Sequence, residues 1–281
     1  MTTPSRPSPL ITPLEPGRAH GLAARPGPGV RQALHGGAFG RYEVAAASTG
    51  GSQHAGNEDA HSPADGAGRL FVVADGVGGG ALASLASQQL VDALHDALEG
   101  PRLDAARVRQ AVLDADRLIA RRIALLTDAP GAATVVLCAP QSLFASKWLI
   151  AWVGDCRAYR LGSTPGAPIE LLTRDHTFGH LDEPPPHGGS LDDPARMVGN
   201  GAVLSASVAL YELGVGELLV LCSDGVHKHL ARDDWPRLLQ ADRPLVQRYD
   251  DLIAQARAQG SIDDATVLLV QRCGLVRGGV Q

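Results

Sequence analysis

Aspartates placed beside short apolar runs constrain this chain more than any other feature of its sequence. They recur in five separated segments, at Asp59, Asp75, Asp155, Asp224 and the pair Asp263-Asp264. A single Asp-Gly step at the end of a strand is ordinarily only a turn signal. Because the pattern is repeated along the chain, it predicts that carboxylates from distant segments meet at one edge of a sheet-based core.

Short apolar runs and longer helical patterns indicate the fold class. Strands are predicted at 42–47, 70–74, 134–139, 148–153, 157–161, 169–172, 218–222 and 266–271. Helical spacing of apolar residues predicts a helix over 82–98, a second from the N-cap Asp104 to 126, and a third over 244–259 that stops at Gly260. Strands grouped in runs and separated by a pair of helices favour an α+β fold over alternating βαβ units. Two antiparallel sheets covered by helices fit this order.

The length of 281 residues suits one catalytic domain with tails. Residues 1–40 are rich in Pro, Gly, Ser, Thr and Arg and are predicted to form a flexible tail. The domain is placed at 41–273, and a short tail at 274–281. The segment 175–201 lacks periodicity and contains three consecutive prolines, which is typical of a lid or a disordered loop.

Charge and composition exclude several functions. The formal net charge is -5, with 30 acidic and 25 basic residues, so no attraction to nucleic acid or to an anionic membrane is expected. No apolar stretch approaches the roughly 20 residues that span a bilayer, and no secretory signal is visible, which predicts a cytoplasmic protein. The four cysteines form no CxxC pair and are interpreted as small buried hydrophobes. Lysine occurs only at Lys147 and Lys228, and no function is inferred from either.

The acidic cluster itself indicates metal chemistry. Carboxylates a few ångströms apart repel one another, and burial makes the charged forms still less favourable. Clustered aspartates therefore need bound cations or strongly raised pKa values. Oxygen ligands without a histidine or cysteine cluster favour Mg²⁺ or Mn²⁺ over zinc.

Six motifs surround these aspartates in a characteristic order. They are Asn57-Glu58-Asp59-Ala60, the stretch VADGVGG at 73–79, the stretch VGDCRAY at 153–159, Leu172-Thr173-Arg174-Asp175-His176, Leu221-Cys222-Ser223-Asp224-Gly225 and Asp263-Asp264-Ala265-Thr266. Each motif is weak by itself, but six in order and at suitable spacing form a strong signal. The chain over 42–273 resembles the bacterial branch of the metal-dependent PPM, or protein phosphatase 2C-like, serine/threonine phosphatases.

The resemblance implies a four-layer αββα sandwich in which two antiparallel sheets are flanked by helices. It also implies a centre that holds two Mn²⁺ or Mg²⁺ ions, with a third, weaker ion beside them. The metal ligands expected from it are Asp59, Asp75, the carbonyl of Gly76, Asp155, Asp224 and Asp263, and the catalytic residues are Asp59, Asp75, Asp224 and Asp263. Asp264 stands where the family usually has asparagine, so the ligand role is assigned to Asp263.

Two further residues are expected to bind the substrate. Five residues before Asp59, where the family usually carries a phosphate-binding arginine, this sequence has His54. Arginine offers a permanently charged bidentate fork, whereas a histidine is charged only near or below its own pKa. Weaker substrate binding that improves toward acidic pH is therefore predicted. In the segment 175–201, which corresponds to the family's flap, Arg196 is a second candidate for binding phosphate or peptide.

Three functions remain open at this stage. The leading hypothesis is a monomeric phosphatase that hydrolyses phosphoserine or phosphothreonine in proteins and opposes a bacterial Ser/Thr kinase. The alternative is a regulatory binding module that keeps the fold and has lost turnover, for which His54 is the main support. The third is hydrolysis of small phosphoesters at an open metal edge.

Overall fold

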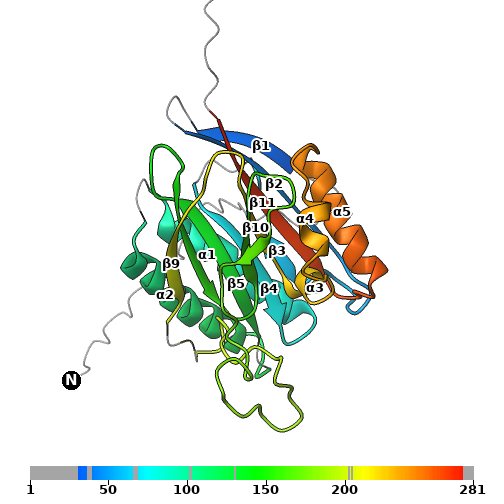
Figure 1. Cartoon of the computed structure of the whole chain (residues 1–281). Helices are drawn as coiled ribbons and strands as arrows, with labels where there is room; N and C mark the ends of the chain where they lie inside the picture. Colours follow the sequence, from blue (N-terminus) through cyan, green and yellow to red (C-terminus); the bar gives the residue numbers. More distant parts are fainter. Residues whose placement is uncertain are drawn as a thin grey trace, which may run out of the picture.

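The computed structural model describes residues 31–36, 40–65, 69–100, 103–129, 131–201, 203 and 205–274, which contain two antiparallel β-sheets (Figure 1). One sheet has the order β3-β4-β5-β6-β9, with bounds Asp59–His61, Phe71–Val77, Ala132–Pro140, Lys147–Val153 and Ser207–Glu212. The other has the order β1-β2-β11-β10-β7-β8, with bounds Arg31–Gly36, Arg41–Thr49, Ala265–Cys273, Leu218–Cys222, Arg157–Leu161 and Ile169–Leu171.

Within the described residues, five helices lie outside the sheets: α1 (Ala81–Leu98), α2 (Ala105–Ala124), α3 (Asp224–His227), α4 (Asp234–Leu238) and α5 (Leu245–Ala258). The predicted N-cap of α2 is confirmed, because Asp104 Oδ1 accepts a hydrogen bond of 2.8 Å from the backbone N–H of Arg107. Gly260 follows α5 with a φ of 96°, a left-handed conformation that favours glycine.

Alternation along the buried strands divides the core into three layers of side chains. In β5, Val136 and Cys138 face the space between the sheets, whereas Val135 and Leu137 face the helices. Aromatic residues fill the inter-sheet space, where Trp148 is 1% exposed. Period-two alternation in a strand that is buried on both faces therefore supplies two core layers at once.

The helices cover the two outer faces of the sandwich. Leu90 and Leu94 of α1, with Val112 and Ile119 of α2, pack on the five-stranded sheet. Leu252 of α5 belongs to the cluster on the six-stranded sheet, together with residues of α4. Figure 1 shows α1 and α2 on one side and α4 and α5 on the other. The predicted four-layer αββα sandwich is confirmed.

The prediction that residues 1–40 form a flexible tail is wrong for Arg31–Gly36, which is strand β1. It pairs antiparallel with β2, and the ring of His35 stacks on Tyr42 with centroids 5.3 Å apart. An edge strand of this kind is held largely by backbone hydrogen bonds, so its sequence lacks an apolar pattern. Residues 1–30, and 275–281 of the predicted C-terminal tail, lie outside the described residues.

The segment 175–201 is a loop that is tied to the sandwich and projects beyond the sheets, where Figure 1 draws it in yellow-green. Val198 forms a bridge with Ala133 of β5, through two backbone hydrogen bonds of 2.8 Å. The buried Asp116 of α2 accepts a hydrogen bond of 2.7 Å from the N–H of Gly199. These contacts support the interpretation of the segment as a flap rather than as a disordered loop.

Candidate metal centre

Strand pairing brings the first two predicted ligands together. Asp59 begins β3 and lies directly opposite Asp75 of β4 in the antiparallel ladder. Side chains of directly opposed residues lie on the same face of a sheet. The strand that begins with Asp59 is not among the predicted strands, because β3 is only three residues long and is too short to show a period in the sequence.

The Asp59 carboxylate is buried, and only one of its two oxygens has a hydrogen-bond partner. Its Oδ2 accepts a hydrogen bond of 2.7 Å from Ser223 Oγ, whereas its Oδ1 is buried and has no hydrogen-bond partner. Burial raises the pKa of Asp59 to about 8, and the charges of Asp224 and Asp264 add to the rise. A buried carboxylate oxygen without a partner is costly, and a bound cation would remove that cost.

The third ligand arrives from the other sheet. Strand β10 ends at Cys222, and the chain turns at Ser223 into the short helix α3, which begins with Asp224. Asp75 and Asp224 share a hydrogen bond, and burial followed by the charge of Asp224 raises the pKa of Asp75 well above its ordinary value. The two carboxyl groups therefore interact directly, and burial together with this interaction disfavours the charged form of Asp75.

Gly225 explains how α3 comes so close to the final strand. A Cβ atom at this position would lie 2.0 Å from the backbone oxygen of Asp264. Since that oxygen belongs to the backbone, it cannot move aside like the end of a flexible side chain. Gly76 is similarly confined, because a Cβ there would lie 2.4 Å from the oxygen of Ala83 and 2.8 Å from that of Glu58. Both glycines of the DG motifs serve close packing around the aspartates.

Asp155 lies in the turn between β6 and β7, beside the same cluster. The turn depends on Gly154, whose φ is 95°. Burial raises the pKa of Asp155 to about 6 even though the charge of Lys228 opposes the rise. The buried His227 of α3 lies with its Nε2 2.9 Å from the backbone oxygen of Asp155, and burial lowers the pKa of His227 to about 3. His227 is therefore a neutral N–H donor that holds this turn against α3.

Lys228 is the residue that sequence reasoning missed. Its Nζ lies 2.7 Å from Asp224 Oδ2 and 3.0 Å from Asp155 Oδ2. Burial alone would lower the pKa of Lys228, but the two carboxylates outweigh burial and raise it. The only signal in the sequence is the spacing of four residues from Asp224, which places the two side chains on one face of a helical turn.

The two aspartates that precede β11, Asp263 and Asp264, have different contacts. Asp264 accepts hydrogen bonds of 2.8 Å from the N–H of Gly51 at Oδ1 and 2.6 Å from the N–H of Glu58 at Oδ2. Asp263 is half-buried, and burial followed by the charge of Asp224 raises its pKa. Asp264 thus holds two loops in place, whereas the charge of Asp224 acts on Asp263, and the ligand role of Asp263 stays a prediction.

The predicted substrate-binding residues lie in different surroundings. His54 has its Nδ1 3.4 Å from Glu58 Oε1, and potential ligand atoms of His54, Asp263 and Asp264 lie within 4.8 Å of one another. Arg196 of the flap forms a two-pronged ion pair with Glu183, at 2.5 and 2.9 Å. The structure therefore brings His54 to the acidic cluster and engages the guanidinium of Arg196 elsewhere in the flap.

The residues present fit a site for hard divalent cations. The side-chain donors contributed by the five aspartates are all carboxylate oxygens, which Mg²⁺ and Mn²⁺ prefer. The Oδ1 of Asp59 is buried and lacks a partner, and four of the carboxyl groups, those of Asp59, Asp75, Asp155 and Asp263, have raised pKa values. Burial is the largest cause of these shifts and repulsion between the carboxylates adds to it, so bound cations would offset both.

Comparison with known sequences identifies the family of this chain. Residues 38–184, about half of the chain, match the family described as protein phosphatase 2C. The chain belongs to the protein phosphatase 2C family. The serine/threonine phosphatase Stp of Listeria welshimeri is 26% identical to it over 223 residues, which cover 74% of this chain and 86% of the relative.

Solved structures of other family members share the fold. The structure of PppA, described as a key regulatory component of T6SS in Pseudomonas aeruginosa, matches with a TM-score of 0.70 and 28% identity over 82% of this chain and 97% of that one. The catalytic domain of PstP, in complex with 2 manganese ions, matches with a TM-score of 0.69 and 24% identity over 83% of this chain and 99% of that one. The predictions of the family, of the sandwich and of a serine/threonine phosphatase of this family are confirmed.

Two expectations about the rest of the chain can also be compared with the structure. Within the described ranges, no helix is both long enough and apolar enough to cross a bilayer. Cys138, Cys156 and Cys222 are buried free thiols, as expected, whereas Cys273 at the end of β11 is only partly buried. Burial raises the pKa of Cys156 well above its ordinary value, so this thiol is a structural residue beside the cluster rather than a reactive one.

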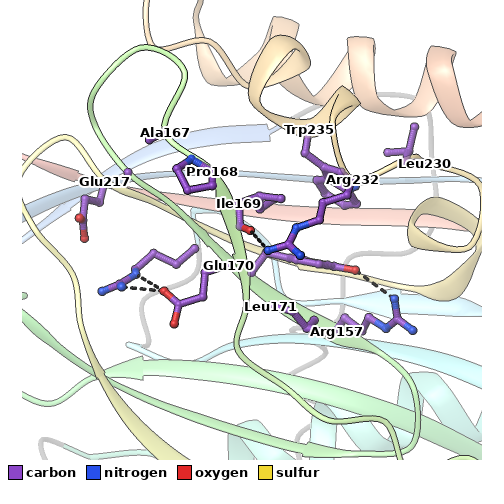
Figure 2. Close-up of a pocket in the computed structure, with 13 residues that line it drawn as sticks. Arg157, Ala167, Pro168, Ile169, Glu170, Leu171, Glu217, Leu230, Arg232 and Trp235 are labelled. Atoms are coloured by element: carbon purple, nitrogen blue, oxygen red, sulfur yellow. Dashed lines mark hydrogen bonds and ion pairs between the residues drawn. The ribbon is translucent and has the colours of Figure 1, made fainter.

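A cavity of about 730 Å³ opens beside the short edge strand β8 (Figure 2). Arg232 donates to the backbone oxygen of Ile169, and Arg160 pairs with Glu170. None of the predicted metal ligands is among the residues that line this cavity in the described part of the chain. The cavity is therefore a separate feature from the acidic cluster. Arg157, which lines the cavity, also pairs with the buried Asp175 of the flap.

Proposed function

We propose that this chain is a metal-dependent protein phosphatase that hydrolyses phosphoserine and phosphothreonine in proteins. The observation that carries the proposal is the opposition of Asp59 and Asp75 across the β3–β4 ladder, where the charge of Asp224 acts on both and the buried Oδ1 of Asp59 lacks a partner. The domain responsible is proposed to span the sandwich up to residue 273.

Two divalent cations would be held by Asp59, Asp75, the carbonyl of Gly76, Asp224 and Asp263. The manganese complex of the PstP catalytic domain supports this number, and either Mn²⁺ or Mg²⁺ suits the oxygen donors. When bound, such ions make water more acidic and neutralise charge that develops on a phosphoryl group.

The chain's own residues would orient the ligands and the substrate. Ser223 fixes the Asp59 carboxylate, and Asp264 holds the loops that contain Gly51 and Glu58. Glu58 in turn accepts a hydrogen bond from the N–H of Gly80 at the start of α1. His54 is proposed to contact the substrate phosphate when it is protonated, and Arg196 to do so when it leaves Glu183.

Substrate and partner follow from the relatives. Stp and PstP are named serine/threonine phosphatases, so a phosphorylated protein is the proposed substrate, and a bacterial Ser/Thr kinase the enzyme whose action is reversed. We further propose that the protein acts as a cytoplasmic monomer.

The proposal is tested by assaying a phosphothreonine peptide and p-nitrophenyl phosphate with and without Mn²⁺. Asp75→Asn should lower the rate on the peptide by about 10³-fold, because metal ions supply several kcal/mol of transition-state stabilisation. The matched control Asp114→Asn changes an exposed aspartate that pairs with Gln110 and Arg117 on the surface of α2, and its rate should stay unchanged. Metal binding without turnover would instead indicate the regulatory binding module, and activity on the small ester alone would indicate a small-phosphoester hydrolase.

A further inference from the structure

The ammonium group of Lys228 lies between two of the predicted metal ligands. It is 2.7 Å from Asp224 Oδ2 and 3.0 Å from Asp155 Oδ2. Divalent ions of this class bind carboxylate oxygens at about 2.0–2.6 Å. An ion held by these same two oxygens would therefore need the space that the ammonium occupies.

The backbone holds Lys228 in this place. Its N–H donates to the backbone oxygen of Asp224 at 3.0 Å, which continues the helical turn of α3. The preceding residue, His227, contacts the backbone oxygen of Asp155 at 2.9 Å. Two consecutive residues thus hold Asp155, one through its backbone and the other through its carboxylate.

Because Asp155 is buried, breaking its ion pair with Lys228 is unfavourable. The Asp155 side chain is 3% exposed, whereas that of Lys228 is 39% exposed. If Lys228 turned toward solvent, the Asp155 carboxylate would remain as an uncompensated buried charge, which is strongly unfavourable. The lysine is therefore expected to stay in place in the folded protein.

Counting charges leads to the same arrangement. The five predicted ligands, Asp59, Asp75, Asp155, Asp224 and Asp263, carry five negative charges when all are ionised, while the neighbouring charge of Asp264 is stabilised by two backbone N–H groups. Two divalent cations would neutralise four of these charges, and the ammonium of Lys228 neutralises the fifth. A third divalent cation in addition to Lys228 would leave the cluster with excess positive charge.

We propose that Lys228 is a fixed cation of this centre, which takes the place of a third divalent ion between Asp155 and Asp224. The expectation that Asp155 is the ligand of a third ion does not fit the structure, because the Lys228 ammonium already forms an ion pair with Asp155 Oδ2 at 3.0 Å, although the hydrogen bond of that ammonium goes to Asp224. The inference rests on the proposed function only in requiring the two-ion site. Asp155 then serves to position Lys228, and Lys228 competes with the metal for Asp224.

The test counts bound ions. Wild-type protein, Lys228→Met and Lys228→Arg are dialysed to equilibrium against a series of Mn²⁺ concentrations, and bound manganese is measured by elemental analysis. Methionine keeps the length of the side chain without its charge, and arginine keeps the charge. Lys228→Met should bind one more Mn²⁺ per chain than the wild type, and it should bind the first ions about tenfold more tightly because Asp224 is released. Lys228→Arg should bind the same number as the wild type.

Adding Asp155→Asn to Lys228→Met should remove the extra ion. The proposal is overturned if Lys228→Met binds the same number of ions as the wild type, or if a wild-type crystal soaked in Mn²⁺ shows an ion on Asp155 with Lys228 displaced. The crystal decides the matter even if the variants fail to fold, because an ammonium still seated on both aspartates supports the proposal. A wild-type protein that binds no manganese would instead overturn the proposed metal-dependent function.

Discussion

Asp59 and Asp75 face each other across the β3–β4 ladder, as directly opposed residues of an antiparallel pair. This register places two buried carboxylates on one face of a sheet, where burial and then the charges of Asp224 and Asp59 raise the pKa of Asp75. Ser223 stabilises one of the four carboxylate oxygens, and Asp224 approaches from the second sheet. In the metal-free protein, burial and repulsion between these carboxylates therefore disfavour their charged forms at the site that the ions would occupy.

The first prediction concerns the stability of metal-free protein. The folded pKa of Asp59 is raised to about 8, whereas an unfolded carboxyl titrates near about 4. The proton that only the folded state retains stabilises it fully below about pH 4, and this stabilisation is lost as the pH rises through about 8. Asp155, raised to about 6, changes stability in the same direction.

The melting temperature of protein treated with a chelator should therefore fall by roughly 5–10 °C between about pH 5 and about pH 8. Saturating Mn²⁺ should restore most of this loss, since the ions favour the charged carboxylates. Calorimetry at both pH values, with and without Mn²⁺, measures the effect. A metal-free melting temperature that rises over this range would contradict the prediction.

The second prediction separates Asp263 from Asp264. Asp263→Asn should weaken Mn²⁺ binding by about 10–100-fold and leave the melting temperature of the metal-free protein nearly unchanged. Asp264→Ala removes the acceptor of two backbone N–H groups, at 2.6 and 2.8 Å, and should cost about 3–5 kcal/mol of unfolding free energy. Denaturant titration and Mn²⁺ titration of both variants test this division, which fails if the two substitutions have the same profile.

The third prediction concerns His54 and the substrate phosphate. His54→Arg should lower KM for a phosphothreonine peptide by about tenfold at about pH 8, because arginine remains charged there. The KM of the wild type should fall toward acidic pH, whereas that of the variant should hardly change. Steady-state kinetics over a pH series at saturating Mn²⁺ measures both. A wild-type KM that does not vary with pH would count against the role assigned to His54.

The fourth prediction concerns the pairing of Arg196 with Glu183. The two side chains are 25% and 40% exposed, so solvent screens their ion pair and the pair is easily broken. If Arg196 binds the substrate after leaving Glu183, Glu183→Gln should lower KM by up to about fivefold. Arg196→Ala should raise KM with little change in kcat, and unchanged KM values in both variants would remove Arg196 from the substrate site.

The fifth prediction concerns the approach of α3 to the final strand. Gly225→Ala places a Cβ 2.0 Å from the backbone oxygen of Asp264, so it should destabilise the fold by ~3 kcal/mol and lower the melting temperature by roughly 6–12 °C. Gly56→Ala is the matched control, because a Cβ there meets no atom within 4 Å. Equal melting temperatures for the two variants would show that the close approach is absent.

The amino-acid sequence by itself determined the strands that are buried on both faces, the three long helices and the set of acidic residues. Apolar periodicity and capping residues are local signals, and β7 and β10 are predicted with the bounds that the structure shows. The edge strands β1 and β9 carry no such signal, because backbone pairing holds them and their side chains are partly exposed.

Only the tertiary structure decided which partners the charged side chains contact. Asp264 holds two loops, Arg196 pairs with Glu183, and Lys228 lies between Asp155 and Asp224. The Asp155–Lys228 pair joins positions that are far apart in the chain, so it forms only when the turn after β6 meets helix α3. Sequence order thus indicates which carboxylates assemble, whereas the packing of the two sheets determines which cation each of them meets.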